Sequence, residues 1–461
     1  MEARRADLIV LGGGAAGFAA ALQAAEAGHS VLLLEKEASI GGSSAMSGGC
    51  LAFAGTDIQR AQGIADSDEL LASDLRELGG GDADEALIAA YVGNQHDTYE
   101  WLRDHGQVFG AALEASSGQS VPRVHNVDPA DMVRLLAARC RDTGRVEVLL
   151  GTAARRLVRD PASGRVLGVA AQGADGGFEA WAEQGVILAS GGFSRDPELV
   201  RRFAPDCIHG VFIGGAGNTG DGLRMAWQLG ADLRDMAHIK GTFGKHPTDE
   251  TNDHSCLAVY KGAIAVNQDG RRFVDESLSY KLLGSACLRQ PYGAAFQILD
   301  EPILRSGDNQ VRILDFERRL EEGLFVVADT LEDLARQIEV PPEVLRRTVE
   351  TYNAAVDAGE DTEFGRRHLV HNHGALRRIE TAPFYAYPST AAIYGTYCGL
   401  RVDASMRVID VFDAPIEGLF AAGEVVGGLH GAAYMTGSAL GKALIFGRIA
   451  ARSAIRALAP A

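Results

Sequence analysis

The sequence lacks the cysteine patterns that mark a disulfide framework or a metal centre. Its six cysteines are scattered over 461 residues, with no CxxC pair and no His/Cys metal spacing. Such usage is typical of reduced thiols in a cytosolic protein. The first residues run directly into an apolar segment and a glycine turn, which leaves no room for a signal peptide. We therefore expect a cytoplasmic protein with no metal site.

Long apolar runs and a basic excess are also missing. No apolar stretch reaches the length of a membrane span without interruption by glycine or charge. The 61 acidic residues outnumber the 44 basic ones, which gives a net charge of −17 at pH 7. A strongly acidic chain is poorly suited to nucleic acid. We expect neither a nucleic-acid nor a membrane partner, and the length favours two or three domains.

Glycine, by contrast, is abundant at 56 residues, and the first segment shows one use for it. The apolar run 7–11 is followed by the glycine turn 12–17, an Ala-rich helical stretch, Gly28, and a second apolar run, 31–34, that ends at Glu35. This order of strand, glycine turn, helix, strand and acid is typical of a dinucleotide-binding unit. The glycines let the backbone approach a pyrophosphate at a helix N-terminus, and Glu35 is placed to accept hydrogen bonds from a ribose diol.

A second glycine motif spans residues 215–220 and precedes a predicted helix. It lacks a strand and an acid after that helix, which a separate NAD site would require. A structural turn, or a loop that runs along the same cofactor, is therefore the favoured interpretation.

Four groups of motifs extend over nearly the whole chain. They are GGGAAG…LLLEK…GGSSAMSGG, VILASGGF, NTGDG and GLFAAGEVVGGLHGA. Together they resemble the flavoprotein family of soluble fumarate reductases, succinate dehydrogenase flavoprotein subunits and 3-ketosteroid dehydrogenases. The resemblance implies an α/β fold, with a Rossmann-like FAD-binding domain of the glutathione-reductase type and an inserted α+β cap domain. The expected segments are 1–235 and 371–461 for the FAD-binding domain and 236–370 for the cap.

The resemblance also implies which residues bind FAD. The glycine turn would cradle the pyrophosphate, Glu424 would meet the ribityl chain, and the helix that opens at 438–440 would direct N–H groups at flavin N1 and O2. The GGSSAMSGG segment has no histidine, which family members with covalent flavin carry there, so we expect noncovalent FAD. The complete predicted set is Gly12, Gly14, Ala16, Gly17, Glu35, Lys36, Gly41, Gly42, Ser43, Ser44, Gly48, Gly49, Ala154, Asp221, Glu424, Ser438, Ala439 and Leu440.

The substrate positions depart from the fumarate reductase pattern. Tyr280 stands where the acid-donating arginine follows the RFVDE-type motif, and Tyr434, in HGAAYMTGSA, replaces the arginine that binds a carboxylate. Gly395 replaces a carboxylate-binding histidine, and Thr242 takes the place of the cap histidine. Two carboxylates need charge-assisted, bidentate partners. The two missing arginines therefore argue against fumarate or succinate as the substrate.

The replacements are similar to the 3-ketosteroid dehydrogenase branch. That resemblance implies that Tyr280 is the base that removes the α-proton and that Tyr434 and a backbone N–H hold the ketone. Donors that polarise the carbonyl make the α-proton acidic, but a tyrosine with a pKa near 10 needs assistance to act as a base. The other expected pocket residues are Tyr394, Tyr397, Gly437 and Ser438. Packing is the alternative role for tyrosines in loops.

The resulting hypothesis is an FAD-dependent dehydrogenase that desaturates a cyclic ketone, a 3-ketosteroid or a single-ring cyclohexanone, α,β to its carbonyl. An external electron acceptor, oxygen or a quinone or dye, would reoxidise the flavin. One alternative is a flavin-dependent enone or enoate reductase of the fumarate-reductase type. Another is an electron-relay flavoprotein subunit without its own substrate pocket.

Overall fold

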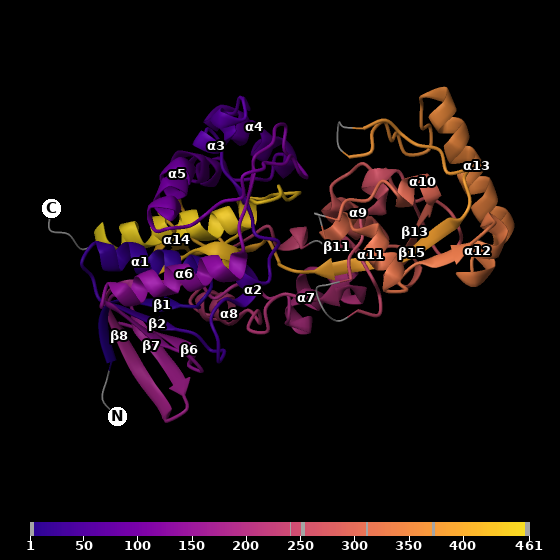
Figure 1. The fold of residues 1–461 in the computed structure, drawn as a ribbon. Coiled ribbons are helices and arrows are strands. Elements are labelled where there is room, and N and C mark those ends of the chain that lie inside the picture. The colour runs from indigo at the N-terminus through magenta and orange to yellow at the C-terminus, as the bar shows by residue number, and fades with distance from the viewer. Residues whose placement is uncertain (1–3, 240, 250–253, 310–311, 371–373, 457–461) are drawn as a thin grey trace. The chain divides into compact units, whose positions relative to one another are not determined.

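The computed structural model describes residues 4–456 except 240, 250–253, 310–311 and 371–373. It divides into two compact units (Figure 1). Unit 1 comprises Met1–Ala204, Gly214–Ile239 and Gly395–Ala461, and unit 2 comprises Pro205–Ile213 and Lys240–Tyr394.

A mostly parallel sheet forms the centre of unit 1. Its strand order is β17-β18-β8-β1-β2-β5, and β7 and β6 continue from β8 as antiparallel strands. The strands are β1 (Arg4–Leu11), β2 (Val31–Leu34), β5 (Val146–Leu149), β6 (Ala153–Arg159), β7 (Val166–Gly173), β8 (Gly176–Leu188), β17 (Arg407–Ile409) and β18 (Pro415–Ala421). All four residues of β2 are buried, as expected for a strand that is covered on both faces.

Three helices cover this sheet: α1 (Ala15–Glu26), α6 (Pro129–Asp142) and α14 (Ser438–Arg456). They lie side by side over the strands in Figure 1, with α1 in contact with both α6 and α14. A side chain at Gly17 would place its Cβ 1.9 Å from the Gly12 carbonyl oxygen, so α1 can approach the turn only with glycine there. The predicted strand, glycine turn, helix and strand are all present.

Unit 1 contains further helices and strands. They are α2 (Gly42–Ala45), β3 (Cys50–Ala52), α3 (Asp57–Ala61), α4 (Asp68–Gly79), α5 (Glu85–Asp104), β4 (Val124–Asn126), α7 (Pro197–Phe203), α8 (Asp221–Trp227), β10 (Leu233–Arg234), η2 (Met236–His238), β16 (Gly399–Leu400) and η6 (Gly423–Val425).

Unit 2 is built around the long strand β15 (Phe384–Ile393). This strand pairs with β11 (Thr242–Lys245), β13 (Ala295–Asp300), β14 (Val326–Ala328) and β9 (Val211–Phe212), and β12 (Ile264–Val266) pairs with β13. The helical elements are η1 (Pro205–His209), η3 (Ala258–Lys261), α9 (Tyr280–Leu288), η4 (Pro291–Gly293), α10 (Glu301–Leu304), η5 (Arg312–Leu314), α11 (Phe316–Glu321), α12 (Leu331–Gln337) and α13 (Pro342–Ala358). Unit 2 therefore mixes helices with a mostly antiparallel sheet, in which only the β9–β15 pair among the described strands is parallel.

The limits of unit 2 differ from the expected cap segment, 236–370. β15 lies beyond residue 370, yet its hydrogen-bonding partners β11, β13 and β14 all lie in unit 2, so the unit continues to Tyr394. Residues 205–213 also join unit 2, because β9 pairs with β15. The glycine and acid motifs used in the sequence give no signal for these pairings.

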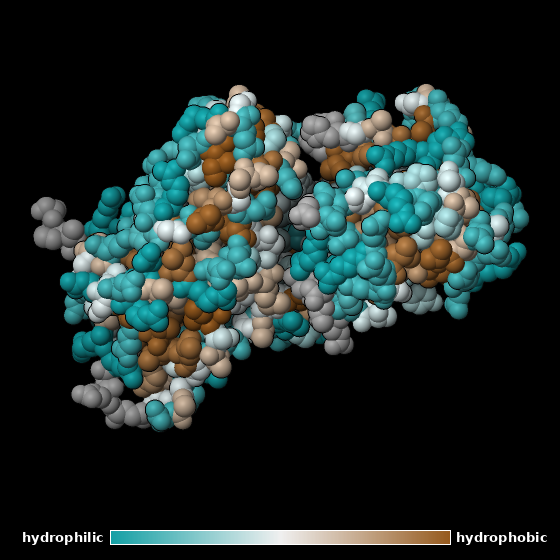
Figure 2. Space-filling view, in the orientation of Figure 1, coloured by the Kyte–Doolittle hydropathy of each residue, from teal (hydrophilic) through white to brown (hydrophobic). Residues whose placement is uncertain are grey.

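The described residues show two further features. Among them, no helix combines the length and the apolar character that crossing a bilayer requires. Their His, Cys, Asp and Glu side chains form no group of three or more that could hold a metal ion. In Figure 2, hydrophilic residues cover much of the visible face of each unit, and hydrophobic residues form smaller groups.

Candidate functional site

The glycine turn of unit 1 opens the N-terminus of α1. Gly12 has a φ of +116°, and a Cβ there would lie 2.3 Å from the Ala189 carbonyl oxygen. Gly14 occupies the N-cap position and therefore supplies no side-chain cap. The Ala15 N–H donates to Ser44 Oγ over 3.1 Å, which brings two of the predicted cofactor segments together. The first N–H groups of a helix lack intrahelical acceptors, so this N-terminus is suited to an anion.

Glu35 lies at the end of β2 and is 9% exposed. Its carboxylate accepts hydrogen bonds from the N–H groups of Gly13 (2.6 Å) and Glu37 (2.8 Å). A carboxylate has about four lone-pair sites, so acceptor capacity remains for a ribose diol. Thr152 N–H donates to the Glu35 carbonyl oxygen over 2.8 Å, which places the segment before Ala154 next to this acid.

Lys36, the next residue, connects β2 to the start of α8. Its Nζ donates to Thr219 Oγ1 (2.6 Å) and to Asp221 Oδ2 (2.5 Å). Two residues of the predicted cofactor set, Lys36 and Asp221, are thereby paired across more than 180 positions of sequence.

The second glycine motif, 215–220, lies beside Ser43 and Glu424. Gly215 N–H and Asn218 Nδ2 donate to Ser43 Oγ over 3.0 and 3.1 Å. Asn218 Nδ2 also donates to both Glu424 carboxylate oxygens, at 3.1 and 3.0 Å. The motif is thus a loop along residues predicted to bind the same cofactor, which supports that interpretation over a second dinucleotide site.

Glu424, in η6, is held in a narrow site between glycines. Its Oε1 accepts the Thr396 N–H over 2.9 Å. A Cβ at Gly192 would lie 2.5 Å from that same oxygen, and one at Gly395 would lie 3.1 Å from it. Glycine at these positions leaves room for a ligand to approach the carboxylate closely.

Buried polar atoms indicate that this surface fits FAD. Ser190 Oγ, Ser194 Oγ and Asn218 Oδ1 are buried and have no hydrogen-bond partner. They belong to the two segments that border Gly12 and Glu424. Buried polar atoms are normally satisfied, and the phosphate and hydroxyl oxygens of a dinucleotide would supply such partners. Ser190 lies in the motif VILASGGF, Ser194 directly follows it, and Asn218 opens NTGDG, although the sequence interpretation assigned these three residues no role.

The start of α14 carries the predicted flavin-facing helix terminus. Gly437 has a φ of +90°, and a Cβ there would lie 2.7 Å from the Ala52 nitrogen. Ser438 Oγ donates to the Met435 carbonyl oxygen over 2.7 Å. One turn later, Lys442 Nζ donates to the Val426 carbonyl oxygen over 2.8 Å. Burial lowers the pKa of Lys442 to about 8, although the Glu424 and Asp235 carboxylates oppose this shift.

The structure brings Tyr434 and Tyr397 together with His430. The ring centroids of Tyr397 and Tyr434 are 4.9 Å apart. The His430 ring centroid lies 5.4 Å from that of Tyr397 and 5.5 Å from that of Tyr434. Tyr397 has a φ of +54°, a conformation that non-glycine residues rarely adopt. The Tyr434 hydroxyl accepts the Gly437 N–H over 3.1 Å. Four predicted substrate residues, Tyr397, Tyr434, Gly437 and Ser438, therefore lie in one region of unit 1.

A separate segment, residues 116–119, fixes the loop that carries Tyr434. Thr436 N–H donates to the Ser117 carbonyl oxygen (3.0 Å), and Gln119 Nε2 donates to the Thr436 carbonyl oxygen (2.9 Å). Ser116 Oγ donates to Thr436 Oγ1 over 3.2 Å. No motif in the sequence marked this segment as part of the site.

The 116–119 segment is itself anchored to a buried ion cluster. Ser120 donates its N–H and hydroxyl to Asp74 Oδ2 at 3.0 and 2.9 Å. The guanidinium of Arg123 pairs with Asp74 and with Asp66, and the Arg123 side chain has no exposed surface. The loop around Tyr434 is therefore held by a rigid support.

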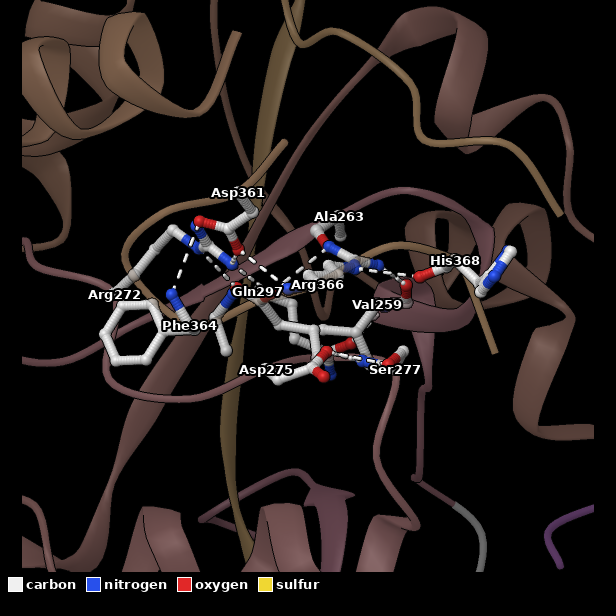
Figure 3. A network of polar contacts seen from close by, with 12 residues as sticks. Val259, Ala263, Arg272, Asp275, Ser277, Gln297, Asp361, Phe364, Arg366 and His368 are labelled. Carbon is white, nitrogen blue, oxygen red and sulfur yellow. Dashed lines mark hydrogen bonds and ion pairs between the residues drawn. The ribbon is translucent and has the colours of Figure 1, made fainter. Parts of the chain in front are cut away.

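In unit 2, Tyr280 is the first residue of α9 and follows the N-cap Ser279. Four residues earlier, Glu276 accepts two hydrogen bonds from Arg272 (2.9 and 2.7 Å) and one from the Ala265 N–H (3.1 Å). Arg272 also bonds to Asp361 (2.8 Å), as the network in Figure 3 shows. The chain that leads into Tyr280 is thereby fixed in a buried network of ion pairs and hydrogen bonds.

Two further contacts concern predicted or neighbouring residues of unit 2. The Tyr394 hydroxyl lies 3.4 Å from Ser255 Oγ, and burial raises the pKa of Tyr394. Lys281 Nζ donates to Thr242 Oγ1 over 2.6 Å, so the position expected for the cap histidine binds a lysine instead. Tyr280 and Tyr394 belong to unit 2 and Tyr397 and Tyr434 to unit 1. Their meeting in one active site stays a prediction.

Known proteins are similar to this chain over most of its length. The FAD binding domain family matches residues 7–440. Fumarate reductase (cytochrome) of Shewanella frigidimarina is 30% identical over 98% of this chain and 77% of that protein. The 4-oxocyclohexanecarboxylate 2-dehydrogenase of Sinomonas cyclohexanicum is 29% identical over 97% of this chain and 92% of that protein.

A solved structure is similar in fold as well as sequence. The 3-ketosteroid-Δ4-(5α)-dehydrogenase of Rhodococcus jostii RHA1, in complex with 4-androstene-3,17-dione, superposes with a TM-score of 0.79. It is 27% identical, and the match covers 98% of each chain. The matches confirm the predicted fold class and FAD as the cofactor.

Proposed function

Because the chain belongs to the family of FAD-dependent fumarate reductases and succinate dehydrogenase flavoproteins, we propose that it desaturates a cyclic ketone next to its carbonyl group. Membership of this family identifies the protein as an FAD-dependent oxidoreductase that acts on CH–CH groups. The ketone and the roles of the tyrosines are the proposal.

The observation that carries this proposal is the pair of tyrosines at the substrate positions. Fumarate-type substrates need arginines at two positions that hold Tyr280 and Tyr434 here. A phenol is a neutral donor or acceptor that suits a ketone, whereas it cannot offset the charge of a carboxylate. This favours a carbonyl substrate over a dicarboxylate.

Tyr434 is assigned to hold the ketone oxygen. Its hydroxyl accepts the Gly437 N–H, and a hydroxyl that accepts a hydrogen bond becomes a stronger donor through its own O–H. Because the Gly437 N–H points at Tyr434 and the Ser438 N–H donates to Met435, these two N–H groups already have acceptors. The second donor to the ketone would be another N–H of the first turn of α14, where intrahelical acceptors are missing.

Tyr280 is assigned to remove the α-proton. It stands at the N-terminus of α9, where the helix dipole favours negative charge. A carbonyl that is polarised by Tyr434 has a more acidic α-proton, so the two tyrosines act on the same enolate-forming step. Bound FAD would supply the hydride acceptor for the β-carbon, and an external acceptor such as oxygen or a quinone would take up the electrons.

The rings beside Tyr434 suit a flat or cyclic substrate. Tyr397 and His430 surround the Tyr434 ring at centroid distances near 5 Å, and aromatic faces bind apolar rings well. The relative named 4-oxocyclohexanecarboxylate 2-dehydrogenase aligns over 92% of its own length. A single-ring ketone is therefore the first substrate class to test, with 3-ketosteroids second.

A second candidate is a reductase that acts on an enone or enoate. The 30% identity to a fumarate reductase over 98% of this chain favours it. In that direction Tyr280 would donate the proton that it accepts in the dehydrogenase. The same residues serve both reactions, so the direction has to be measured.

The test is anaerobic mixing of the oxidised, FAD-loaded protein with 4-oxocyclohexanecarboxylate, cyclohexanone, a 3-ketosteroid or succinate, while the flavin absorbance is followed. Bleaching by a ketone but not by succinate supports the proposal. Bleaching by succinate alone contradicts it. A protein that ketones do not bleach, but whose dithionite-reduced flavin is reoxidised by an enone, is a reductase. A flavin that responds to none of these compounds indicates an electron-relay subunit.

A further inference from the structure

The residue after Tyr280 is a lysine with an almost completely buried side chain. Lys281 is 1% exposed, and its Nζ lies 5.9 Å from the centroid of the Tyr280 ring. Lysine is rarely buried without a reason, because desolvation of an ammonium group is costly. Its placement beside a proposed base therefore suggests that its charge acts on that base.

We propose that Lys281 is a positioning residue whose positive charge stabilises the phenolate form of Tyr280. The inference rests on the proposed role of Tyr280 as the base. It supplies the assistance that a tyrosine needs, because the ordinary pKa of about 10 leaves little phenolate at neutral pH. A cation close to an acid favours its ionised form.

The ammonium group is fixed by a neighbouring strand. Lys281 Nζ donates to Thr242 Oγ1 over 2.6 Å, and Thr242 is the residue of β11 that pairs with Ala392 of β15. α9 packs tightly against this edge, since a Cβ at Gly284 would lie 2.1 Å from the Gly241 carbonyl oxygen. Lys281 therefore extends from a helix that packs closely against the strand whose Thr242 binds its ammonium group.

The helix terminus acts in the same direction as the lysine. Tyr280 occupies the first turn of α9, where the partial positive charge of the helix dipole also favours an anion. A unit charge at about 6 Å, at an effective dielectric constant of about 20, changes an acid dissociation constant by about 100-fold. Solvent and neighbouring dipoles reduce such effects, so we expect about 10- to 100-fold.

Other titratable groups near α9 do not replace this charge. Tyr260, in η3, interacts with Tyr280, but burial raises its pKa and its hydroxyl donates to the Leu278 carbonyl oxygen over 2.8 Å, so it stays neutral. Lys245 of β11 is paired with Asp249. Among the described residues, the elements packed most closely on α9 also carry exposed Asp206 and His209 and buried Cys207 on η1, exposed Tyr292 on η4, and Tyr385, which binds Glu301, and Tyr387 on β15.

The direct test is a titration of Tyr280 that needs no substrate. The FAD-loaded protein is labelled with ¹³C at the tyrosine ring carbon that bears oxygen, and the Tyr280 resonance is assigned by its loss in Tyr280→Phe. In Lys281→Met, the acid dissociation constant of Tyr280 should fall by about 10- to 100-fold relative to the parent protein. Lys281→Arg keeps the charge and should restore most of the difference. Equal titration of Tyr280 in the parent and in Lys281→Met overturns the inference.

A second variant tests the inference even if Lys281→Met does not fold. Thr242→Val keeps the lysine but removes the oxygen that fixes it, and should raise the Tyr280 pKa by less than Lys281→Met does. If Lys281→Met does not fold, a Tyr280 pKa in Thr242→Val equal to that of the parent overturns the inference.

Kinetics separate this inference from the proposed function. With a ketone that reduces the flavin, the rate should rise with pH as Tyr280 ionises, and Lys281→Met should move that rise to higher pH with an unchanged ketone KM. If Tyr280→Phe reduces flavin at the parent rate, the proposed function fails. The NMR titration then still decides whether Lys281 stabilises the Tyr280 phenolate.

Discussion

Gln119 offers the sharpest test of how unit 1 holds the loop that carries Tyr434. Its side-chain amide is 2% exposed, donates to the Thr436 carbonyl oxygen (2.9 Å) and accepts the Ser116 N–H (3.2 Å). Gln119→Met keeps the length of the side chain but removes both hydrogen bonds. Each unpaired buried group costs about 1–3 kcal/mol, so we expect the free energy of unfolding to fall by about 2–5 kcal/mol.

The catalytic effect should exceed what lost stability explains. Thr436 lies two residues after Tyr434, and the loop depends on residues 116–119 for three hydrogen bonds. A displacement of about 1 Å at a positioned group can cost about 100-fold in rate. We therefore expect kcat/KM for flavin reduction by a ketone to fall by about 10- to 100-fold, although Gln119 is assigned no contact with the substrate.

Gln297→Met is the matched control. Gln297 is also a fully buried amide, with bonds to Cys256, Ser389 and Val259, but it lies in unit 2. Urea unfolding should show a comparable loss of stability in both variants. Stopped-flow flavin reduction under conditions where both are folded should show the large loss only in Gln119→Met. Equal rates in the two variants would refute the positioning role.

Four other outcomes are expected. Tyr280→Phe should slow flavin reduction by a ketone by about 10²- to 10⁴-fold with little change in ketone affinity, and an unchanged rate in stopped-flow would place the base elsewhere. Tyr434→Phe should weaken ketone binding and catalysis together, by a few kcal/mol at most, measured as kcat/KM. Acid or heat should release the FAD, so flavin that stays with the denatured polypeptide would show a covalent bond. Burial lowers the pKa of His125 to about 4, so the unfolded chain binds more protons than the folded protein between about pH 4 and 6.5. The free energy of unfolding should therefore fall as the pH is lowered through this window, and a pH series of urea unfolding should show a smaller fall in His125→Gln.

The cofactor half of the molecule could be predicted well, because its physics is local in sequence. A pyrophosphate needs glycines at fixed spacing before a helix, and an acid at the end of the next strand. Those requirements leave a readable pattern, and the structure places Gly12, Gly17 and Glu35 in that arrangement. The missing strand and acid after residues 215–220 left a structural turn or a loop along the same cofactor, and the contacts with Ser43 and Glu424 favour the loop.

Pairings between distant segments could not be predicted in the same way. β15 joins unit 2 through hydrogen bonds to strands more than 80 residues earlier, and no turn motif marks such a partner. Gln119 and Arg123 resemble ordinary polar loop residues in the sequence. Their importance comes from burial, which depends on the complete fold.

The two tyrosines show why a replaced residue is informative only together with its surroundings. A tyrosine in place of an arginine removes a charge, and this alone could mean a lost function. In the structure, however, Tyr434 is fixed by Gly437 and Tyr280 is followed by a buried lysine on a helix N-terminus. Charge is thus retained one residue from the lost arginine, where it can act on the tyrosine instead of on a carboxylate substrate. Under the proposed function, that arrangement serves a site for ketones better than a site that has merely lost its arginines.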